Sequence, residues 1–143
     1  MLHIFLSTLI YTILVSVSSS FLTSLPVPVF LGILYVLPII VNLLFIKLQK
    51  NDTSKLIYSM LLPTMATVSY LIFAYITSIS GAWAEFVKMN TLTDGTMSID
   101  IAENLFSSSQ ILFVVFVNYV SSAAYYLLTK VAQKKEMKGI KYA

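Results

Sequence analysis

Residues 1–46 read MLHIFLSTLIYTILVSVSSSFLTSLPVPVFLGILYVLPIIVNLLFI, and none of them is Lys, Arg, Asp or Glu. A membrane-spanning helix needs roughly 20 apolar residues, so this stretch has room for two helices and a turn. The turn lies near Pro26 and Pro28, because a proline disfavours helical geometry in the residue before it. The stretch therefore predicts a first span over residues 4–22 and a second span over residues 29–46.

The composition of the whole chain indicates the same class of protein. Of its 143 residues, 58% are hydrophobic and only 10% are charged. A soluble domain carries roughly a quarter charged residues. The chain has no cysteine, which excludes disulfides and thiolate catalysis. The sequence therefore predicts an all-α integral membrane protein with a single four-helix transmembrane domain over residues 1–143.

The charged residues mark the ends of the other spans. A basic loop at Lys47–Lys55 follows the second span, an acidic stretch follows the third, and a lysine-rich tail ends the chain. The uncharged runs between these segments are each long enough for one span. The remaining predicted segments are a third span at 56–80, an external acidic segment at 81–104, a fourth span at 105–129 and a tail at 130–143.

The lysine distribution predicts the orientation, because loops rich in Lys and Arg stay on the cytoplasmic side. Two spans separate the basic loop from the basic tail, so both can be cytoplasmic. This predicts a multi-pass protein of the cell membrane with cytoplasmic N- and C-termini and an external 81–104 segment. A secretory signal peptide is the alternative for the first span. It is disfavoured because only His3 stands where Lys or Arg is expected.

The first span carries small hydroxyl residues at four-residue spacing, which aligns them on one helix face. Small residues in such a line allow close approach of another helix, and their hydroxyls can bond across to it or back to the preceding turn. We expect a helix-packing seam. A polar stripe beside a pore, or a self-association face, is the alternative. The stripe consists of Thr8, Thr12, Ser16 and Ser20.

Two prolines and two amides lie within the other spans. Pro38 and Pro63 each remove a backbone hydrogen bond at membrane depth, which predicts a kink or a locally opened helix. Asn42 and Asn118 are the amides inside the predicted hydrocarbon, where each needs a partner on another helix. A direct bond between these two amides is compatible with the topology, and structural support is their predicted role.

The external segment carries the remaining candidate residues. Trp83 and Phe86 are typical of a short helix at the membrane interface. Asp100 and Glu103 have the spacing of an N-cap and its reciprocal acid, which predicts that the fourth helix begins near Ile101. Binding of a cation or docking of a partner by the acidic residues is the alternative. The external acidic residues are Asp94, Asp100 and Glu103.

The predicted spans contain no Asp, Glu, His, Lys or Arg at depth, which disfavours a proton-coupled transporter and a voltage sensor. His3 is the single histidine, and no carboxylate pair has ligand spacing within a span, so no metal site is predicted. The serines and threonines have no histidine or buried lysine to activate them. We therefore predict no catalytic residue, no cofactor and no enzymatic activity.

The order of these segments carries a family resemblance. An apolar pair of spans with proline in the second is followed by a basic loop, an acidic segment containing Ser98-Ile99-Asp100-Ile101, and a last span containing Tyr125-Tyr126-Leu127. In this layout the chain resembles the small Msa-type membrane proteins of staphylococci and related Gram-positive bacteria. The resemblance extends over nearly the whole chain. It implies an effect on the expression of a virulence regulator, and it supplies no catalytic residues.

The predicted function is that of a non-enzymatic membrane protein that acts through a partner. It would modulate signalling and virulence regulation, or serve as an accessory subunit of a larger membrane transporter complex. The expected partners are the lipid bilayer and a transporter, a sensor or a second copy of the chain. The alternative is a small homo-oligomeric channel or transporter with a hydroxyl-lined path, because such pores need no charge. All nine basic residues are lysines, most of them beside the spans, so anionic lipid and not nucleic acid is the expected counter-charge.

Overall fold

The computed structural model describes residues 2–94, 97–99, 101 and 103–140 of the chain. Four of its helical segments are long and apolar enough to cross a membrane, as expected for a multi-pass membrane protein. The predicted helical class is thereby confirmed, with one small hairpin added. The four segments are Leu2–Ser20, Val27–Lys47, Asp52–Ile79 and Ser108–Gln133.

The elements follow one another with short connections. The second spanning segment is built from three consecutive pieces, α2, η2 and α3, and the two short strands pair antiparallel with Leu92 opposite Ile99. In chain order the elements are α1 (Leu2–Ser20), the 3₁₀ turn η1 (Leu22–Ser24), α2 (Val27–Leu31), the π-helical η2 (Gly32–Val36), α3 (Leu37–Lys47), α4 (Asp52–Ile79), α5 (Ala82–Asn90), β1 (Leu92–Asp94), β2 (Met97–Ile99) and α6 (Ser108–Ile140).

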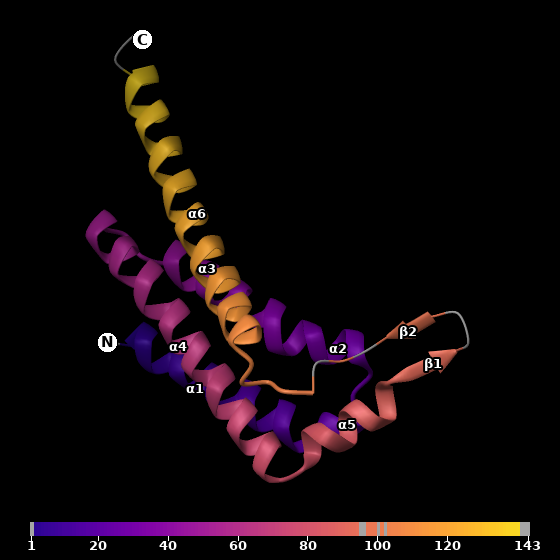
Figure 1. The fold of residues 1–143 in the computed structure, drawn as a ribbon. Helices are drawn as coiled ribbons and strands as arrows, with labels where there is room; N and C mark the ends of the chain where they lie inside the picture. The colour runs from indigo at the N-terminus through magenta and orange to yellow at the C-terminus, as the bar shows by residue number, and fades with distance from the viewer. Residues whose placement is uncertain (1, 95–96, 100, 102, 141–143) are drawn as a thin grey trace.

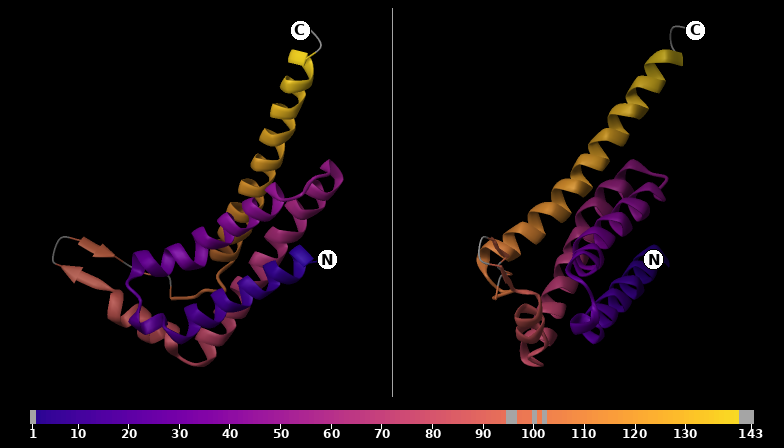
Figure 2. Two further views of the ribbon diagram at one scale, coloured as in Figure 1. Left: turned by 180° about the vertical axis from the view of Figure 1, so that it is seen from behind. Right: turned by 90° about the vertical axis from the view of Figure 1, so that its right-hand side faces the viewer.

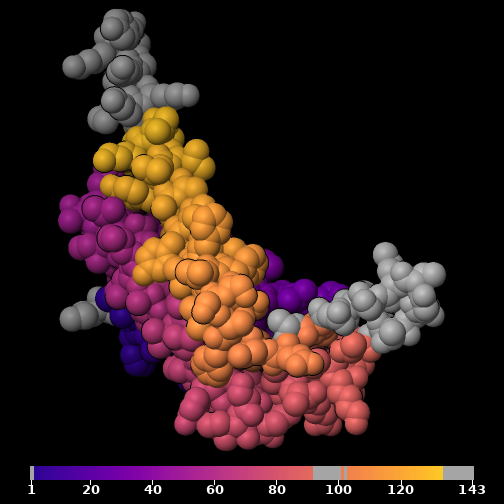
Figure 3. Space-filling model, in the orientation of Figure 1, coloured from indigo at the N-terminus to yellow at the C-terminus, as the bar shows by residue number. Residues whose placement is uncertain are grey.

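Helix α4 is the centre of the helix packing, since it contacts α1, α3 and α6. Helix α5 turns away from the end of α4 and leads into the hairpin, which projects to one side (Figure 1). The C-terminal part of α6 extends beyond the ends of α3 and α4 (Figure 2). In the helical body, α4 and α6 pack side by side (Figure 3).

One end of the helical body carries Lys47, Lys50, Lys55 and Lys130, and we call it the lysine end. The His3 Nδ1 atom of α1 lies 2.8 Å from Gln49 Nε2, in the loop that joins α3 to α4. Gln133 of α6 contacts Asp52 and Lys55 in the first turn of α4. The start of α1, the α3–α4 loop and this part of α6 therefore share one end, as four spans of alternating direction require.

The opposite end is closed by packed aromatic rings, and we call it the aromatic end. The ring of Phe30 lies against Phe73, Trp83 and Phe86, with centroid distances of 5.8, 5.7 and 5.0 Å. Helix α5 thus buries Trp83 and Phe86 against the spans. The predicted short helix at this position is confirmed, and both of its aromatic side chains lie in the core.

Pro38 lies just after a local opening of the second span. A proline has no N–H to donate, and in an α-helix its ring clashes with the carbonyl four residues earlier. Here the backbone widens to π geometry over η2, where the Leu37 N–H bonds to the Gly32 carbonyl five residues back. Pro63, in contrast, lies inside α4, which continues as one helix from Asp52 to Ile79.

The fourth helix begins later than the acidic residues predict. Helix α6 begins at Ser108, so the predicted start near Ile101 is wrong. The segment before it runs across the aromatic end, where Leu105 is buried and its carbonyl accepts a 3.0 Å bond from the Tyr70 hydroxyl. The Trp83 Nε1–H donates to the Glu103 carbonyl at 3.1 Å. These tertiary contacts hold the chain in a non-helical path until residue 107.

Ser107 takes the capping position that the acidic spacing assigns to Asp100, which lies outside the described residues. Its carbonyl accepts from the Ile111 N–H at 3.0 Å, and its Oγ accepts from the Gln110 N–H at 3.4 Å. That pattern defines an N-cap. A signal for it is present in the sequence, because Ser107-Ser108-Ser109-Gln110 fits the capping-box spacing.

Ser107→Ala is expected to lower the free energy of unfolding by about 0.5–1 kcal/mol, the lower part of the range for lost N-caps, because the capping bond is long. Unfolding in detergent micelles, followed by circular dichroism during titration with a denaturing detergent, measures the change. Ser108→Ala is the matched control, because its side chain forms no hydrogen bond with a described residue. Equal losses in both variants would contradict a capping role for Ser107.

Candidate functional site

A set of buried polar side chains links three of the spans. The Tyr11 hydroxyl of α1 donates to Asn42 Oδ1 of α3. Asn42 Nδ2 donates to Asn118 Oδ1 of α6 at 3.2 Å, and Asn118 Nδ2 donates to the Val114 carbonyl at 3.0 Å. The exposed fractions of Tyr11, Asn42 and Asn118 are 2%, 0% and 4%. The three side chains therefore satisfy one another inside the helical body.

The two predicted intramembrane amides are thus brought together, and Tyr11 is a third member that was not predicted from the sequence. Tyr11 lies on the buried face of α1, together with Ser7 and Ser18. These positions are four and seven residues apart, which is the spacing of one helix face. The sequence does not single out this face, because hydroxyl residues lie both on it and on the exposed stripe.

A second set of polar contacts lies nearer the aromatic end. Gln110 Nε2 of α6 donates to the Tyr35 hydroxyl of η2. The ring of Tyr35 also lies 6.3 Å from that of Tyr70 in α4, centroid to centroid. This set ties α6 to the π-helical part of the second span, close to the opening before Pro38.

The predicted hydroxyl stripe lies on an exposed face of α1. Thr8, Thr12, Ser16 and Ser20 are all exposed, whereas the buried residues of α1 are Ser7, Tyr11 and Ser18. The stripe is therefore not buried in the described part of the chain, and its role as a packing seam stays a prediction. The buried face of α1 lies beside it, where the Tyr11 hydroxyl donates to Asn42.

Three residues of the stripe line an open groove between α1 and α4. Its volume is about 390 Å³, and most of its wall is apolar. The hydroxyls of Thr8 and Thr12 donate to carbonyls of their own helix, at 2.8 and 2.9 Å. The groove is lined by Thr8, Tyr11, Thr12, Val15 and Ser16 of α1 and by Thr64, Met65, Val68, Ser69, Ile72 and Ile76 of α4.

The polar residues on the α4 wall are likewise bonded. Ser69 Oγ donates to the Met65 carbonyl at 2.8 Å. Thr64 Oγ1 donates to the Met60 carbonyl at 2.9 Å. The hydroxyl of Tyr119 in α6 lies 2.7 Å from Thr64 Oγ1. The groove is therefore a largely apolar surface of small side chains whose hydroxyl donors are mostly taken.

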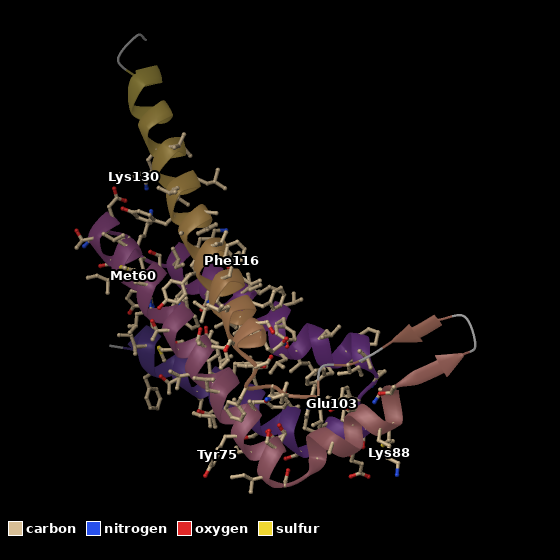
Figure 4. The ribbon with its side chains drawn as sticks, in the orientation of Figure 1. Met60, Tyr75, Lys88, Glu103, Phe116 and Lys130 are labelled. Atoms are coloured by element: carbon tan, nitrogen blue, oxygen red, sulfur yellow. The ribbon has the colours of Figure 1, made fainter. Side chains whose placement is uncertain are left out.

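The external acidic residues do not form a described cluster. Glu103 is exposed and, together with Lys88, lines a pocket of about 470 Å³ next to α5 (Figure 4). Asp100 and the side chain of Asp94 lie outside the described residues. Among the residues that the structure describes, no group of three or more His, Cys, Asp or Glu side chains could hold a metal ion.

Comparisons of the chain with protein-family models, with curated proteins and with solved structures give no match. The function must therefore be inferred from the geometry of the chain's own residues.

Proposed function

We propose that this chain is a non-enzymatic, multi-pass protein of the cell membrane that acts by receiving a transmembrane helix of a partner protein. The partner is a transporter, for which the chain serves as an accessory subunit, or a membrane sensor whose signalling it modulates. The resemblance to Msa-type proteins favours the second role. The lysine end faces the cytoplasm, because lysine-rich segments are retained there.

The groove between α1 and α4 is the observation that carries this proposal. It lies within two spanning segments, so its occupant is an apolar chain or a helix and not a soluble molecule. Small residues such as Thr8, Thr12 and Ser16 allow backbones to approach closely, and dispersion forces in such contacts drive helix association in lipid. Because Thr8 and Thr12 already donate to their own helix, a docking helix need not satisfy them.

The alternative is a homo-oligomeric channel with a path lined by the stripe. Such a path would require the hydroxyls to face water or a permeant molecule. Two of them are bonded within α1, and the deepest polar side chains bond one another. These contacts favour a packing surface over a polar path.

Site-specific photo-cross-linking in native membranes tests the proposal. A photoreactive amino acid at position 12 is expected to give one adduct of discrete mass with a partner. The same group at Leu112, which is 66% exposed on α6, is the control and should give none. Adding Ser16→Leu to the position-12 variant should reduce the adduct severalfold, because the larger side chain fills the groove. Chain abundance should not change, because Ser16 is exposed.

The mass of the adduct separates the two functions. An adduct with a different, larger protein supports the accessory or modulator role. An adduct of two 16.0 kDa chains, together with flux in liposomes that Thr12→Val alters, would overturn it in favour of the channel. Equal adducts from positions 12 and 112 would contradict any specific docking surface.

A further inference from the structure

The lysine end contains a pocket that the proposed helix-docking role does not use. It lies between the end of α3, the start of α4 and the middle of α6, and its volume is about 270 Å³. Lys47 is the last residue of α3, and Lys55 lies in the first turn of α4. We call this the lysine pocket, and it is lined by Lys47, Lys55, Tyr125, Thr129, Ala132 and Gln133.

Lys55 is the unusual residue of this pocket, because only 9% of its surface is exposed. A buried ammonium group is costly unless an anion or several acceptors surround it. In the amide orientation that satisfies both neighbours, Gln133 Oε1 accepts from Lys55 Nζ at 2.9 Å and Gln133 Nε2 donates to Asp52 Oδ1 at 3.2 Å. The carboxylate of Asp52 thus reaches Lys55 only through a neutral amide.

Among the described side chains, the pocket therefore holds positive charge without a direct counter-ion. Within the described part of the chain, neither Lys47 nor Lys55 forms an ion pair. The Tyr125 hydroxyl makes no hydrogen bond to a described residue either, so a donor remains for a ligand. Two ammonium groups and a phenol around one space are suited to an anionic group with several acceptor oxygens, as in a phosphate.

The position of the pocket indicates where that phosphate comes from. Lys47 ends one spanning segment and Lys55 lies in the first turn of the next, so we place the pocket at the depth of the lipid headgroups. One helical turn before Ala132, Leu128 exposes 69% of its surface on α6, which suits an acyl chain beside the pocket. Basic pockets between spans at the cytoplasmic side bind anionic headgroups in this way.

We infer that the lysine pocket binds the phosphate of one anionic phospholipid, held by Lys55 and Lys47 between α3, α4 and α6. The lipid would thereby contact three spans at the lysine end. This site is independent of the groove between α1 and α4, so either can fail without the other.

Native mass spectrometry of the purified chain, with counted lipids added in neutral detergent, tests the inference. One molecule of phosphatidylglycerol is expected to bind, at least tenfold more tightly than phosphatidylcholine. Lys55→Gln should weaken this binding by roughly tenfold, as expected for the loss of one charge-assisted bond. Lys47→Gln should weaken it severalfold. Because Lys47 is exposed, that variant tests the pocket even if Lys55→Gln fails to fold.

Two lysines outside the pocket provide matched controls. Lys50→Gln alters the loop between α3 and α4, near the pocket. Lys88→Gln alters the opposite end of the protein (Figure 4). Both should bind phosphatidylglycerol like the unmodified chain. Equal losses in all four variants would show a diffuse surface attraction and overturn the site. Displacement of the lipid by inorganic phosphate or glycerol 3-phosphate at similar concentrations would overturn the lipid as its source.

Discussion

Phe30→Ala is expected to lower the free energy of unfolding by about 3 kcal/mol, because it removes the central ring of the aromatic end. Phe30 is 2% exposed and its ring touches three others, Phe73, Trp83 and Phe86. Truncating a buried phenylalanine costs about 3–5 kcal/mol in soluble proteins. The lower end applies, because an unfolded span remains in an apolar phase and the loss is mainly of packing. Equilibrium unfolding in mixed micelles measures it.

Phe116→Ala is the matched control for this prediction. Phe116 lies on the outer face of α6 and is 64% exposed (Figure 4). Truncating Phe116 removes mainly contacts with lipid, so the free energy of unfolding should change by less than about 0.5 kcal/mol. Similar losses at both positions would mean that the aromatic end adds nothing specific to stability. Proteolysis of the α5 segment should also accelerate in Phe30→Ala, because α5 loses the ring against which it packs.

The spans themselves follow from charge and hydropathy alone. The predicted segments at 4–22, 29–46, 56–80 and 105–129 correspond to Leu2–Ser20, Val27–Lys47, Asp52–Ile79 and Ser108–Gln133. A bilayer imposes one length and one polarity on every span, so composition is decisive there. The ends differ by a few residues because a helix continues past the hydrocarbon wherever its backbone remains bonded.

The rotation of each helix about its axis does not follow from the sequence. In α1 the buried positions are Ser7, Tyr11 and Ser18, while the exposed stripe begins with Thr8. In a soluble protein the polar face would reveal which side is buried. In α1 hydroxyl residues lie on both faces, so polarity does not distinguish the buried face from the exposed one. Contacts with residues distant in the sequence decide which face is buried. Asn42, which is 31 residues from Tyr11, makes the decisive one.

Because of tertiary contacts, two local features also differ from what the sequence pattern predicts. Lys55 reads as part of a solvated basic loop, yet it lies in the first turn of α4 and is buried by α6. Asp100 and Glu103 read as a helix start, yet the Glu103 carbonyl bonds Trp83 and the helix begins at Ser108. In both cases the partner lies at least 20 residues away along the chain, beyond the reach of a local motif.

Asn42→Leu is expected to lower the free energy of unfolding by about 1–2 kcal/mol, more than any other change in the buried polar chain. Leu has the branched shape of Asn and the same number of side-chain heavy atoms, so the substitution changes polarity more than shape. The substitution leaves two groups without partners, the Tyr11 hydroxyl and Asn118 Oδ1. Each stranded group costs about 1 kcal/mol or somewhat less, since bonds between membrane helices average about 0.6 kcal/mol.

Asn42 stands in the middle of the chain of bonds, and this position predicts a ranking among variants. Tyr11→Phe and Asn118→Leu each strand only one atom of Asn42, so each should cost about half as much as Asn42→Leu. Changing Tyr11, Asn42 and Asn118 together removes every donor and acceptor of this hydrogen-bonded set except the Val114 carbonyl, which keeps its bond within the helix. Replacing all partners by apolar groups of similar shape is nearly neutral. The triple variant should therefore unfold within about 1 kcal/mol of the unmodified chain. Additive losses across the three sites would contradict a connected chain of hydrogen bonds, whereas a triple variant more stable than Asn42→Leu alone follows only if Tyr11, Asn42 and Asn118 satisfy one another.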